Sequence, residues 1–567
     1  MTTQRASEQR TGWILGLNHG IHDAAAVLLR DGELAVMIEQ ERLSRRKGAF
    51  NEAPVDALRY CLDYAGLTLD QVDGVALASD LDRFAQWLGL DGEERRRQLI
   101  YDDPDRLFPV EVFGSGQRPS PVPVRHHLAH AASAFWLSGF DEAAVLVVDK
   151  RGEDSSAMLA HGVGTEFRVL ESIGVAESLG LYYQTATQYA GLYDESSGGY
   201  GKLMGLAAYG RPDQPAALCV SSGAPAFEAL PSLADLPGRE VAMTRASQLL
   251  DYFTDRCFPY TVGLRDEVLA YANFAASVQR SLEDVLLALA GRLHTLTGSR
   301  RLVVAGGVGL NCSANGAVAR SGLFDDVFVQ PVAHDAGAAL GAALELSRRL
   351  RPGSRPGSPM THAYWGPSFD QGMIDATLER HGVGFELLDE STLIERVADL
   401  LARGSVVGWF QGRAEVGPRA LGARSLLGDP RTRRTLVRLN RIKGREMWRP
   451  VAPSVLHERF SRYFVDAPPN PFMIVSAWVR DEVRALVPAI VHVDGSARPQ
   501  AVTAEANPRF WRLIAAFERR TGVPLVVNTS FNLQGEPIVN TPDEAVRDFL
   551  QAGIDALAIG DALALKR

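Results

Sequence analysis

The chain has 567 residues, 46% of them hydrophobic, which is enough for two or three domains with separate cores. Its formal net charge is −9 and it contains no long basic run, so we expect no nucleic-acid partner. The four cysteines are isolated and form no CxxC pair, which argues against a zinc ribbon and against a disulfide framework.

The polar start of the chain lacks the apolar core of a secretory signal, and no apolar stretch reaches the roughly 18 residues that span a membrane. We therefore expect a cytoplasmic protein without a membrane partner. Apolar runs at 13–17, 24–29 and 33–39 predict three strands. The polar loop between the first two contains His19 and His22, and a general base would be well placed there. The charged run that follows is typical of a solvated face.

The next segments alternate between helix and strand patterns. Residues 54–66 predict an amphipathic helix, and apolar runs at 75–78, 143–148 and 302–305 predict buried strands. The last two strands end in Asp149 and in a Gly-Gly turn. Strands that alternate with helices and end in such turns predict an α/β fold with ligands at the strand ends. The sequence shows no internal repeat.

A histidine pair lies ahead of the strand that ends in Asp149. His126 and His130 are four residues apart, so on a helix they share one face, and this spacing suits two imidazole ligands of one metal ion. Asp149 and Asp335 are candidates for the carboxylate that would complete the site and leave positions open for phosphate or water. A histidine pair without a metal remains the alternative at this point.

A glycine cluster and several rare lysines indicate anion binding. Glycines between a strand and a helix let a phosphate approach the backbone, although a tight turn without a ligand explains them equally well. The chain prefers arginine to lysine, and its internal lysines lie in glycine-rich or charge-dense segments, where a compact point charge is useful. The residues concerned are Gly306, Gly307, Gly309 and Asn311, and Lys47, Lys150, Lys202 and Lys443.

The remaining chain predicts a linker and a second α/β domain. Residues 348–368 are rich in Pro and Gly, and we expect domains at 1–350 and 369–567 with a linker at 351–368. Strands are predicted at 406–410 and 524–527. Arginines and small polar residues gather in glycine-rich loops of this half, which suits a polyanion such as a triphosphate or carbamoyl phosphate. Surface arginines are the alternative. These residues include Arg413, Arg419, Arg424, Lys443, Arg449, Arg498, Asn528, Ser530 and Asn532.

Motifs along nearly the full length carry a resemblance to a known family. They read GLNHGIHDAA, EQERLSRRK, HHLAHAASAF, GGVGLNCSAN, GRAEVGPRALGARS, KGREMWRPVAPSV and VNTSFNLQGEP. With them the chain resembles the O-carbamoyltransferases of antibiotic and nodulation-factor biosynthesis, the family of the tobramycin and cephalosporin carbamoyltransferases. The three C-terminal motifs are the most specific.

The resemblance implies a fold and a two-stage reaction. The N-terminal domain would be of the Kae type, within the actin-like ATPase (ASKHA) fold, and the C-terminal domain would be an α/β domain of the YrdC type. The substrates would be ATP, carbamoyl phosphate and a small-molecule alcohol. Carbamate would be adenylated in the C-terminal domain, and the carbamoyl group would then pass to the alcohol in the N-terminal domain. Mg²⁺ with ATP and a homodimer are compatible with this scheme.

The resemblance also assigns roles to residues. It implies a divalent metal, most simply iron, on His126, His130, Asp149 and Asp335, and it makes His22 the essential loop histidine. Lys443, Arg449 and Arg498 would neutralise phosphate charge during adenylation. Substrate and nucleotide would be bound by Lys47, Lys150, Gly306, Gly307, Gly309, Asn311, Arg419, Arg424, Asn528, Ser530 and Asn532.

The chain departs from the family pattern at one position, and two other functions stay open. Lys150 stands where the family usually has glycine, and it would either pair with a phosphate or crowd it out. A transferase that acts on tRNA shares the same domain types, but the acidic balance argues against it. Hydrogenase maturation proteins share them too, yet their CxxC motifs are missing here. An ATP-switched binding protein without enzymatic activity would leave the arginine-rich loops unexplained.

Overall fold

The computed structural model describes residues 12–116, 118–194, 198–257 and 265–566. Within these residues the N-terminal half contains two five-stranded sheets of the same topology. The first has the order β3-β2-β1-β4-β5 and the second the order β8-β7-β6-β11-β12. In each sheet, neighbouring strands among the first three of this order are antiparallel. The last two strands run parallel to the third, which is β1 in the first sheet and β6 in the second. This repeated topology confirms the predicted actin-like ATPase fold.

The strands of the two sheets agree with the apolar runs of the sequence. The first sheet consists of β1 (Trp13–Asn18), β2 (Ala25–Arg30), β3 (Glu33–Glu39), β4 (Gly74–Leu77) and β5 (Val122–Pro123). The second consists of β6 (Glu142–Val148), β7 (Ser155–Val163), β8 (Glu166–Gly174), β11 (Arg301–Ala305) and β12 (Asp326–Val329). The predicted amphipathic helix is α2 (Val55–Ala65), whose buried positions face β2 and β3. Of these elements, the sequence predicts β1, β2, β3, β4, β6, β11 and α2, whereas it does not predict β5, β7, β8 and β12.

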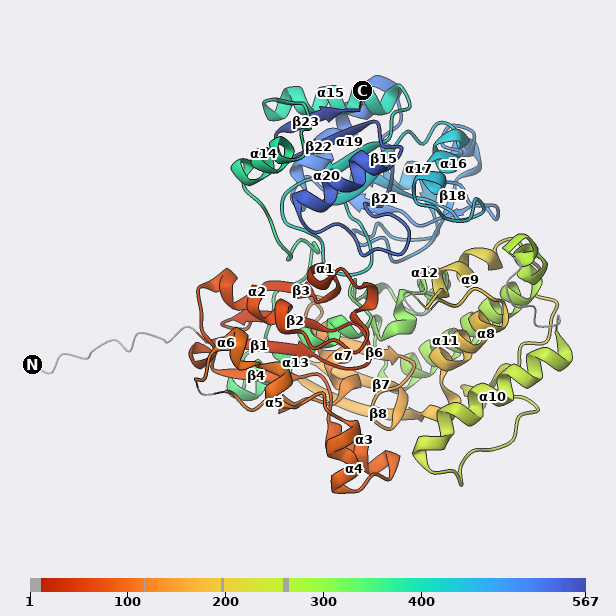
Figure 1. Cartoon of the computed structure of the whole chain (residues 1–567). Coiled ribbons are helices and arrows are strands. Elements are labelled where there is room, and N and C mark those ends of the chain that lie inside the picture. Colours follow the sequence, from red (N-terminus) through yellow and green to blue (C-terminus); the bar gives the residue numbers. More distant parts are fainter. Residues whose placement is uncertain (1–11, 117, 195–197, 258–264, 567) are drawn as a thin grey trace, which may run out of the picture.

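Two helices pack against each other between the sheets (Figure 1), namely α7 (His126–Phe135) and α13 (Asp335–Leu350). Helix α13 also packs on β1, β2 and β4, and α7 packs on β6 and β11. The backbones approach very closely, because a Cβ added to Gly341 would lie 1.6 Å from the carbonyl oxygen of Ala129. This contact fixes the N-terminal ends of both helices relative to the two sheets, which matters for the side chains that they carry.

Longer helices cover the outer part of the N-terminal half. They are α8 (Leu179–Tyr189), α9 (Tyr200–Ala207), α10 (Gly238–Arg256), α11 (Ala272–Thr297) and α12 (Cys312–Arg320). Helix α11 packs on α9, α12 and β6, so it supports the segment that follows β11. Among the described residues, no helix combines the length and the apolar character that a membrane crossing requires.

The C-terminal half is an α/β domain built on one mixed sheet of the order β13-β23-β22-β14-β15-β21-β16-β20. The predicted strands are β14 (Val407–Phe410) and β21 (Leu525–Ser530). The helix α19 (Pro508–Thr521) packs on α15 (Glu390–Ala402) and on the sheet. The helix α20 (Pro542–Gln551) packs on α14 (Gln371–Arg380) and also on the sheet. The remaining strands are β13 (Phe385–Leu387), β15 (Arg424–Gly428), β16 (Ala452–Leu456), β20 (Gln500–Val502), β22 (Ala556–Ile559) and β23 (Ala562–Leu565).

Most of the charged run that begins at Glu39 lies at the interface between the two halves, whereas Arg46 is exposed as a solvated face would be. Glu39 and Arg42 are only 4% and 5% exposed. Glu39 accepts a hydrogen bond from the backbone N–H of Gly417 at 2.6 Å, and Arg42 donates to the carbonyl of the same residue at 2.7 Å. Arg45 donates to the carbonyls of residues 537 and 538. The expectation failed because a solvated charged run and one that is buried against a distant partner have the same local sequence.

Asp548 on α20 gives a pH-dependent prediction. Its side chain is 1% exposed, and neither carboxylate oxygen has a hydrogen-bond partner among the described residues. Burial, and then the charge of Glu536, raises the pKa of Asp548 to about 7. The carboxyl of the unfolded chain titrates near 3.9. Between these values the folded state binds the extra proton, so the free energy of unfolding must fall as the pH rises from about 4 to about 7.

We therefore expect Asp548→Asn to melt at a higher temperature than the wild type at pH 8, and we expect this difference to shrink steadily toward pH 4. Thermal unfolding followed by circular dichroism at several pH values measures it. Asp481→Asn serves as the control, because that carboxylate is 84% exposed. A melting-temperature difference that stays constant from pH 4 to pH 8 would show that Asp548 titrates normally.

Candidate active site

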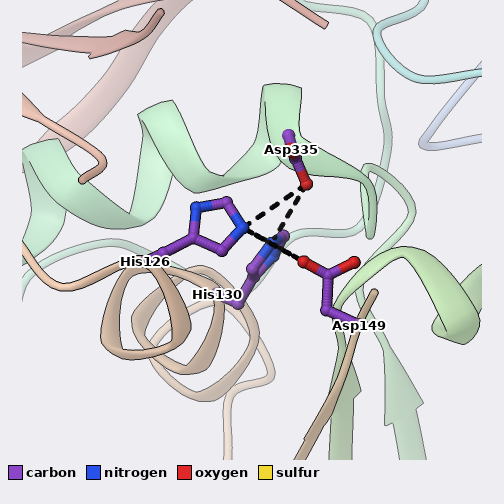
Figure 2. Close-up of side chains that lie close together, drawn as sticks. All are labelled: His126, His130, Asp149 and Asp335. Atoms are coloured by element: carbon purple, nitrogen blue, oxygen red, sulfur yellow. Dashed lines mark hydrogen bonds and ion pairs between the residues drawn. The ribbon is translucent and has the colours of Figure 1, made fainter. Parts of the chain in front are cut away.

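Four side chains from three parts of the chain converge between the two sheets (Figure 2). His126 and His130 lie one turn apart on α7, Asp149 follows the end of β6, and Asp335 is the first residue of α13. Nε2 of His126 lies 3.1 Å from Asp149 Oδ2 and 3.5 Å from Asp335 Oδ1. Nε2 of His130 lies 3.6 Å from Asp335 Oδ1. The four ligand atoms all lie within 4.8 Å of one another.

The chemistry of these atoms fits a metal ion. The Nδ1 of His126 lies 3.1 Å from the carbonyl oxygen of Ala78, which can only accept, so the ring proton belongs on Nδ1 and the Nε2 lone pair faces the carboxylates. Two imidazole nitrogens and two carboxylate oxygens at this spacing repel one another unless a cation lies among them. Burial lowers the pKa of His126, but Asp335 and Asp149 together raise it well above its usual value. Two imidazoles with carboxylates are a common set for first-row transition metals.

His22 extends this site on the side of the loop between β1 and β2. Its Nδ1 lies 3.0 Å from Asp23 Oδ2 and 3.8 Å from Asp335 Oδ2. Although burial alone would lower it, these carboxylates raise the pKa of His22 to about 9. At this pKa the ring carries a proton on both nitrogens near neutral pH; once it is neutral, the bond to Asp23 keeps the remaining proton on Nδ1, and Nε2 is then the atom that can take a proton from a substrate.

Local hydrogen bonds shape the His22 loop. The side-chain amide of Asn18 donates to the carbonyls of His22 and Asp23, and Asp23 adopts a left-handed φ of 57°. The backbone N–H of Asp23 donates to the carbonyl of Gly48 at 2.7 Å. Glu41 in turn accepts a bond from the N–H of Gly48 at 2.7 Å. The loop that carries His22 is therefore bound directly to the segment that carries Lys47.

The glycine cluster after β11 lies against the metal-site aspartate. Gly306 has a φ of 88°, and a Cβ there would lie 2.3 Å from the carbonyl oxygen of Val148. The N–H of Gly307 donates to Asp149 Oδ1 at 3.2 Å. Asn311 caps α12, and its amide group pairs with Gln279 in both directions. These contacts favour a structural role for Asn311, whereas the glycines keep the backbone close to Asp149.

Lys150 directly follows Asp149. Burial lowers the pKa of Lys150, and so does the nearby Arg151, while the charges of Asp149, Asp335 and Asp23 act in the opposite direction. Its backbone is enclosed as well, because a Cβ on Gly180 would lie 2.6 Å from the Lys150 Cα. A half-buried ammonium in this position adds positive charge on the edge of the metal site.

We predict that Lys150→Gly weakens the affinity of the N-terminal site for a nucleotide phosphate about 10- to 100-fold, because one charge-assisted contact to phosphate contributes about 1.5–3 kcal/mol. Calorimetric titration with AMP measures the change. Lys566→Gly is the control, since that ammonium binds backbone carbonyls at the far end of the chain. Unchanged AMP affinity and unchanged transfer in Lys150→Gly would mean that this lysine merely fills the turn.

A second group of charged side chains lies in the loops of the C-terminal half and includes Lys47 from the N-terminal half. The pKa of Lys443 lies well below its usual value, chiefly because of burial and further because of the charges of Arg445, Arg449 and Lys47. Burial and Arg498 lower the pKa of Arg419 to about 9. Lys47, Arg419, Lys443, Arg445, Arg449 and Arg498 are called the cationic cluster below. Such a concentration of buried positive charge is favourable only beside a polyanion.

Unsatisfied donors in the cationic cluster agree with this interpretation. Among the described residues, Nε of Arg419, Nη2 of Arg445 and Nε of Arg498 are buried and have no hydrogen-bond partner. Buried guanidinium donors without a partner are costly, and phosphate oxygens would satisfy them in bidentate fashion. Arg445 was missing from the sequence-based prediction, although it lies in the same KGREMWRP motif as Lys443 and Arg449.

Lys443 uses its amine to hold the strand end of β21. Its Nζ lies 2.6 Å from the carbonyl oxygen of Ser530 and 3.1 Å from the Ser530 hydroxyl. It also lies 3.0 Å from the carbonyl oxygen of Asn532 and 2.6 Å from Asn532 Oδ1. An ammonium has three donors, so these four acceptors occupy it fully. Lys443 therefore contributes its charge to the cluster and also organises two of the predicted substrate-binding residues.

Arg424 and Asn528 are enclosed in the C-terminal core. The guanidinium of Arg424 donates to backbone carbonyls, including that of Pro367 at 3.0 Å, and lies over the ring of Phe410. The amide of Asn528 donates to the hydroxyl of Ser454 at 2.9 Å and to the carbonyl of Ala420. Both side chains have no exposed surface. These contacts favour structural roles, which sequence reasoning could not separate from substrate binding because the residues share motifs with Arg419 and Ser530.

Comparison with known proteins identifies the family. A family model described as Carbamoyltransferase N-terminus matches residues 115–344, and one described as Carbamoyltransferase C-terminus matches residues 398–566. Nodulation protein NolNO of Sinorhizobium fredii is 38% identical over 97% of this chain and 80% of its own length. The chain belongs to the carbamoyltransferase family. Nodulation protein NolO of Bradyrhizobium diazoefficiens is 40% identical over 78% of this carbamoyltransferase and 79% of its own length.

The family assignment confirms the predicted resemblance, and this carbamoyltransferase is accordingly a transferase enzyme. Solved structures are more distant. An activator of the 2-hydroxyisocaproyl-CoA dehydratase from Clostridium difficile has 14% identity and a TM-score of 0.31, and the match covers 59% of this chain and 95% of that one. We draw nothing from a likeness of this size.

Proposed function

We propose that this carbamoyltransferase uses ATP and carbamoyl phosphate to place a carbamoyl group on a hydroxyl of a small molecule. The observation that carries the proposal is the presence of two chemically different sites that one segment joins. Lys47 belongs to the cationic cluster, and its neighbour Gly48 binds the backbone of Asp23 beside His22. A reactive intermediate made at one site would have only a short way to the other.

The first stage would take place at the cationic cluster. Water would hydrolyse carbamoyl phosphate to inorganic phosphate and carbamate, and the carbamate oxygen would attack the α-phosphorus of ATP, so that carbamoyladenylate forms and pyrophosphate leaves. Both steps release phosphate groups with additional negative charge. Arg419, Arg445, Arg449 and Arg498 would hold these groups, and preorganised positive charge of this kind lowers the barrier most where charge develops. ATP would bring Mg²⁺ with it.

The second stage would take place beside His22. The neutral imidazole would take the proton of the acceptor hydroxyl at Nε2, the alcohol oxygen would form a bond to the carbamoyl carbon, and AMP would leave. Asp23 would keep the ring proton on Nδ1 and stabilise the imidazolium that results. Lys150 would provide positive charge near the departing phosphate.

The metal centre would support this second stage. His126, His130, Asp149 and Asp335 would hold the ion, and we propose iron, which suits imidazole and carboxylate donors. When bound, a divalent cation supplies Lewis-acid stabilisation for the negative charge of the leaving phosphate. Without the ion, the charge of Asp335 raises the pKa of His22; the positive charge of the ion would offset that of Asp335 and so favour the neutral imidazole.

Pyrophosphate release is the decisive assay. We expect the purified enzyme to release pyrophosphate from ATP only when carbamoyl phosphate is present, and to carbamoylate members of a panel of aminoglycoside, macrolide and β-lactam alcohols. Release without carbamoyl phosphate, or no release at all, would contradict the proposed first stage. Carbamoyl-type modification of tRNA instead of small alcohols would favour the transferase that acts on tRNA, and nucleotide binding without turnover would favour a switched binding protein.

A further inference from the structure

Glu153 is a buried carboxylate in the turn between β6 and β7, and it takes no part in the sites described above. Its side chain is 2% exposed. One oxygen, Oε1, accepts hydrogen bonds from the backbone N–H of His126 at 2.8 Å and from that of Asp80 at 2.9 Å. A carboxylate with two backbone donors makes strong, charge-assisted bonds. Glu153 therefore ties the second sheet to the start of α7 and to the segment after β4.

The two backbone N–H groups that Glu153 binds belong to segments that set the position of the His126 ring. The first belongs to His126 itself, and it is one of the N–H groups that a helix start leaves unsatisfied. Arg125, the residue before α7, makes no side-chain cap bond, so Glu153 serves as the cap from a distant part of the chain. The second lies in the segment whose Ala78 carbonyl accepts the proton of His126 Nδ1 at 3.1 Å.

The other histidine of the pair has no such support. Nδ1 of His130 is buried and has no hydrogen-bond partner among the described residues. The orientation of His126 is thus the one that depends on a contact outside the helix, and Glu153 is a carboxylate that binds both the start of this helix and the segment that makes the contact. In metal sites, hydrogen bonds that orient a ligand ring commonly change metal affinity 10- to 100-fold.

We propose that Glu153 is a positioning residue of the metal centre, which holds the His126 imidazole by binding its backbone and the segment that fixes its Nδ1. The inference rests on the proposed metal site. Because only the acceptor oxygen is needed, Glu153→Gln should preserve the arrangement, whereas Glu153→Ala removes it. Glu345 on α13 provides a matched control, since it is equally buried at 2% and lies far along the helix from Asp335.

The test is a competition titration of the metal-free full chain with Fe²⁺, and with Co²⁺ as a spectroscopic probe, against a chelator of known affinity. We expect Glu153→Ala to bind both ions 10- to 100-fold more weakly, while Glu153→Gln and Glu345→Ala stay within about threefold of the wild type. Circular dichroism shows whether each variant is folded. If Glu153→Ala does not fold, Glu153→Asp replaces it, because the shorter side chain cannot reach both N–H groups and should weaken binding as well.

The outcomes separate the two levels of the inference. Wild-type affinity in Glu153→Ala, or in Glu153→Asp where that variant is needed, would overturn the positioning role and leave the metal centre intact. Loss of affinity in Glu153→Gln equal to that in Glu153→Ala would overturn it as well, because the oxygen acceptor is still present. A wild-type chain that binds neither ion would overturn the metal centre, and the role of Glu153 with it.

Discussion

Replacing His126 or His130 by alanine is expected to abolish metal binding and carbamoyl transfer together. Each variant removes one of two imidazole nitrogens that converge with Asp149 and Asp335 within 4.8 Å. Loss of a direct ligand should cost more than the 10- to 100-fold in affinity that loss of an outer hydrogen bond costs. Elemental analysis of the purified variants measures the bound metal, and an assay with an accepted alcohol measures transfer.

His127→Asn is the matched control, because this histidine lies between the two on the same helix and its Nδ1 faces the hydroxyl of Ser155 at 3.1 Å. It should retain the metal. Full metal occupancy in either His126→Ala or His130→Ala would refute the ligand assignment. Loss of the metal with unchanged transfer would instead separate the ion from the reaction.

Lys443→Ala and His22→Asn are expected to fail at different stages. Lys443→Ala removes a cation from the cluster and releases the Ser530–Asn532 segment, so pyrophosphate release should fall steeply. A charge-assisted contact of this kind contributes about 1.5–3 kcal/mol, which corresponds to roughly one to two decades in rate. His22→Asn should release pyrophosphate normally from ATP and carbamoyl phosphate, yet it should not carbamoylate the acceptor, because the base is missing.

Ser530→Ala tests the predicted role of Ser530 in substrate binding. It removes one of four acceptors and leaves the ammonium of Lys443 with as many partners as it has donors, so a fall in pyrophosphate release would report a contact of the Ser530 hydroxyl with substrate. Both stages are measured on the same preparations, with pyrophosphate and carbamoylated product as separate readouts. If His22→Asn stops pyrophosphate release as completely as Lys443→Ala does, the assignment of two separate sites is wrong.

The sequence by itself determined the local elements and the family. Continuous apolar runs between polar turns predicted β1, β2 and β3, because a short apolar run of this length is typical of a buried strand. The spacing of His126 and His130 placed both rings on one face of a helix, because residues four apart lie about one turn apart. The C-terminal motifs KGREMWRP and VNTSFN carried the resemblance to the family in the second half of the chain. A motif of this kind is recognised from the order of its residues, so no knowledge of their contacts is needed.

Only the tertiary structure decided which residues meet and which are buried. Asp149 and Asp335 reach the histidines because two sheets of equal topology bring the end of β6 and the start of α13 to one place, although the sequence shows no repeat. From the sequence, Glu39 and Arg42 are expected on a solvated face, but in the structure they are buried against the backbone of Gly417. Arg424 and Arg419 lie in one motif, yet the first is fully buried and donates to several backbone carbonyls, whereas the second is only partly buried. Burial and long-range pairing depend on residues far away in the chain, and no local pattern records them.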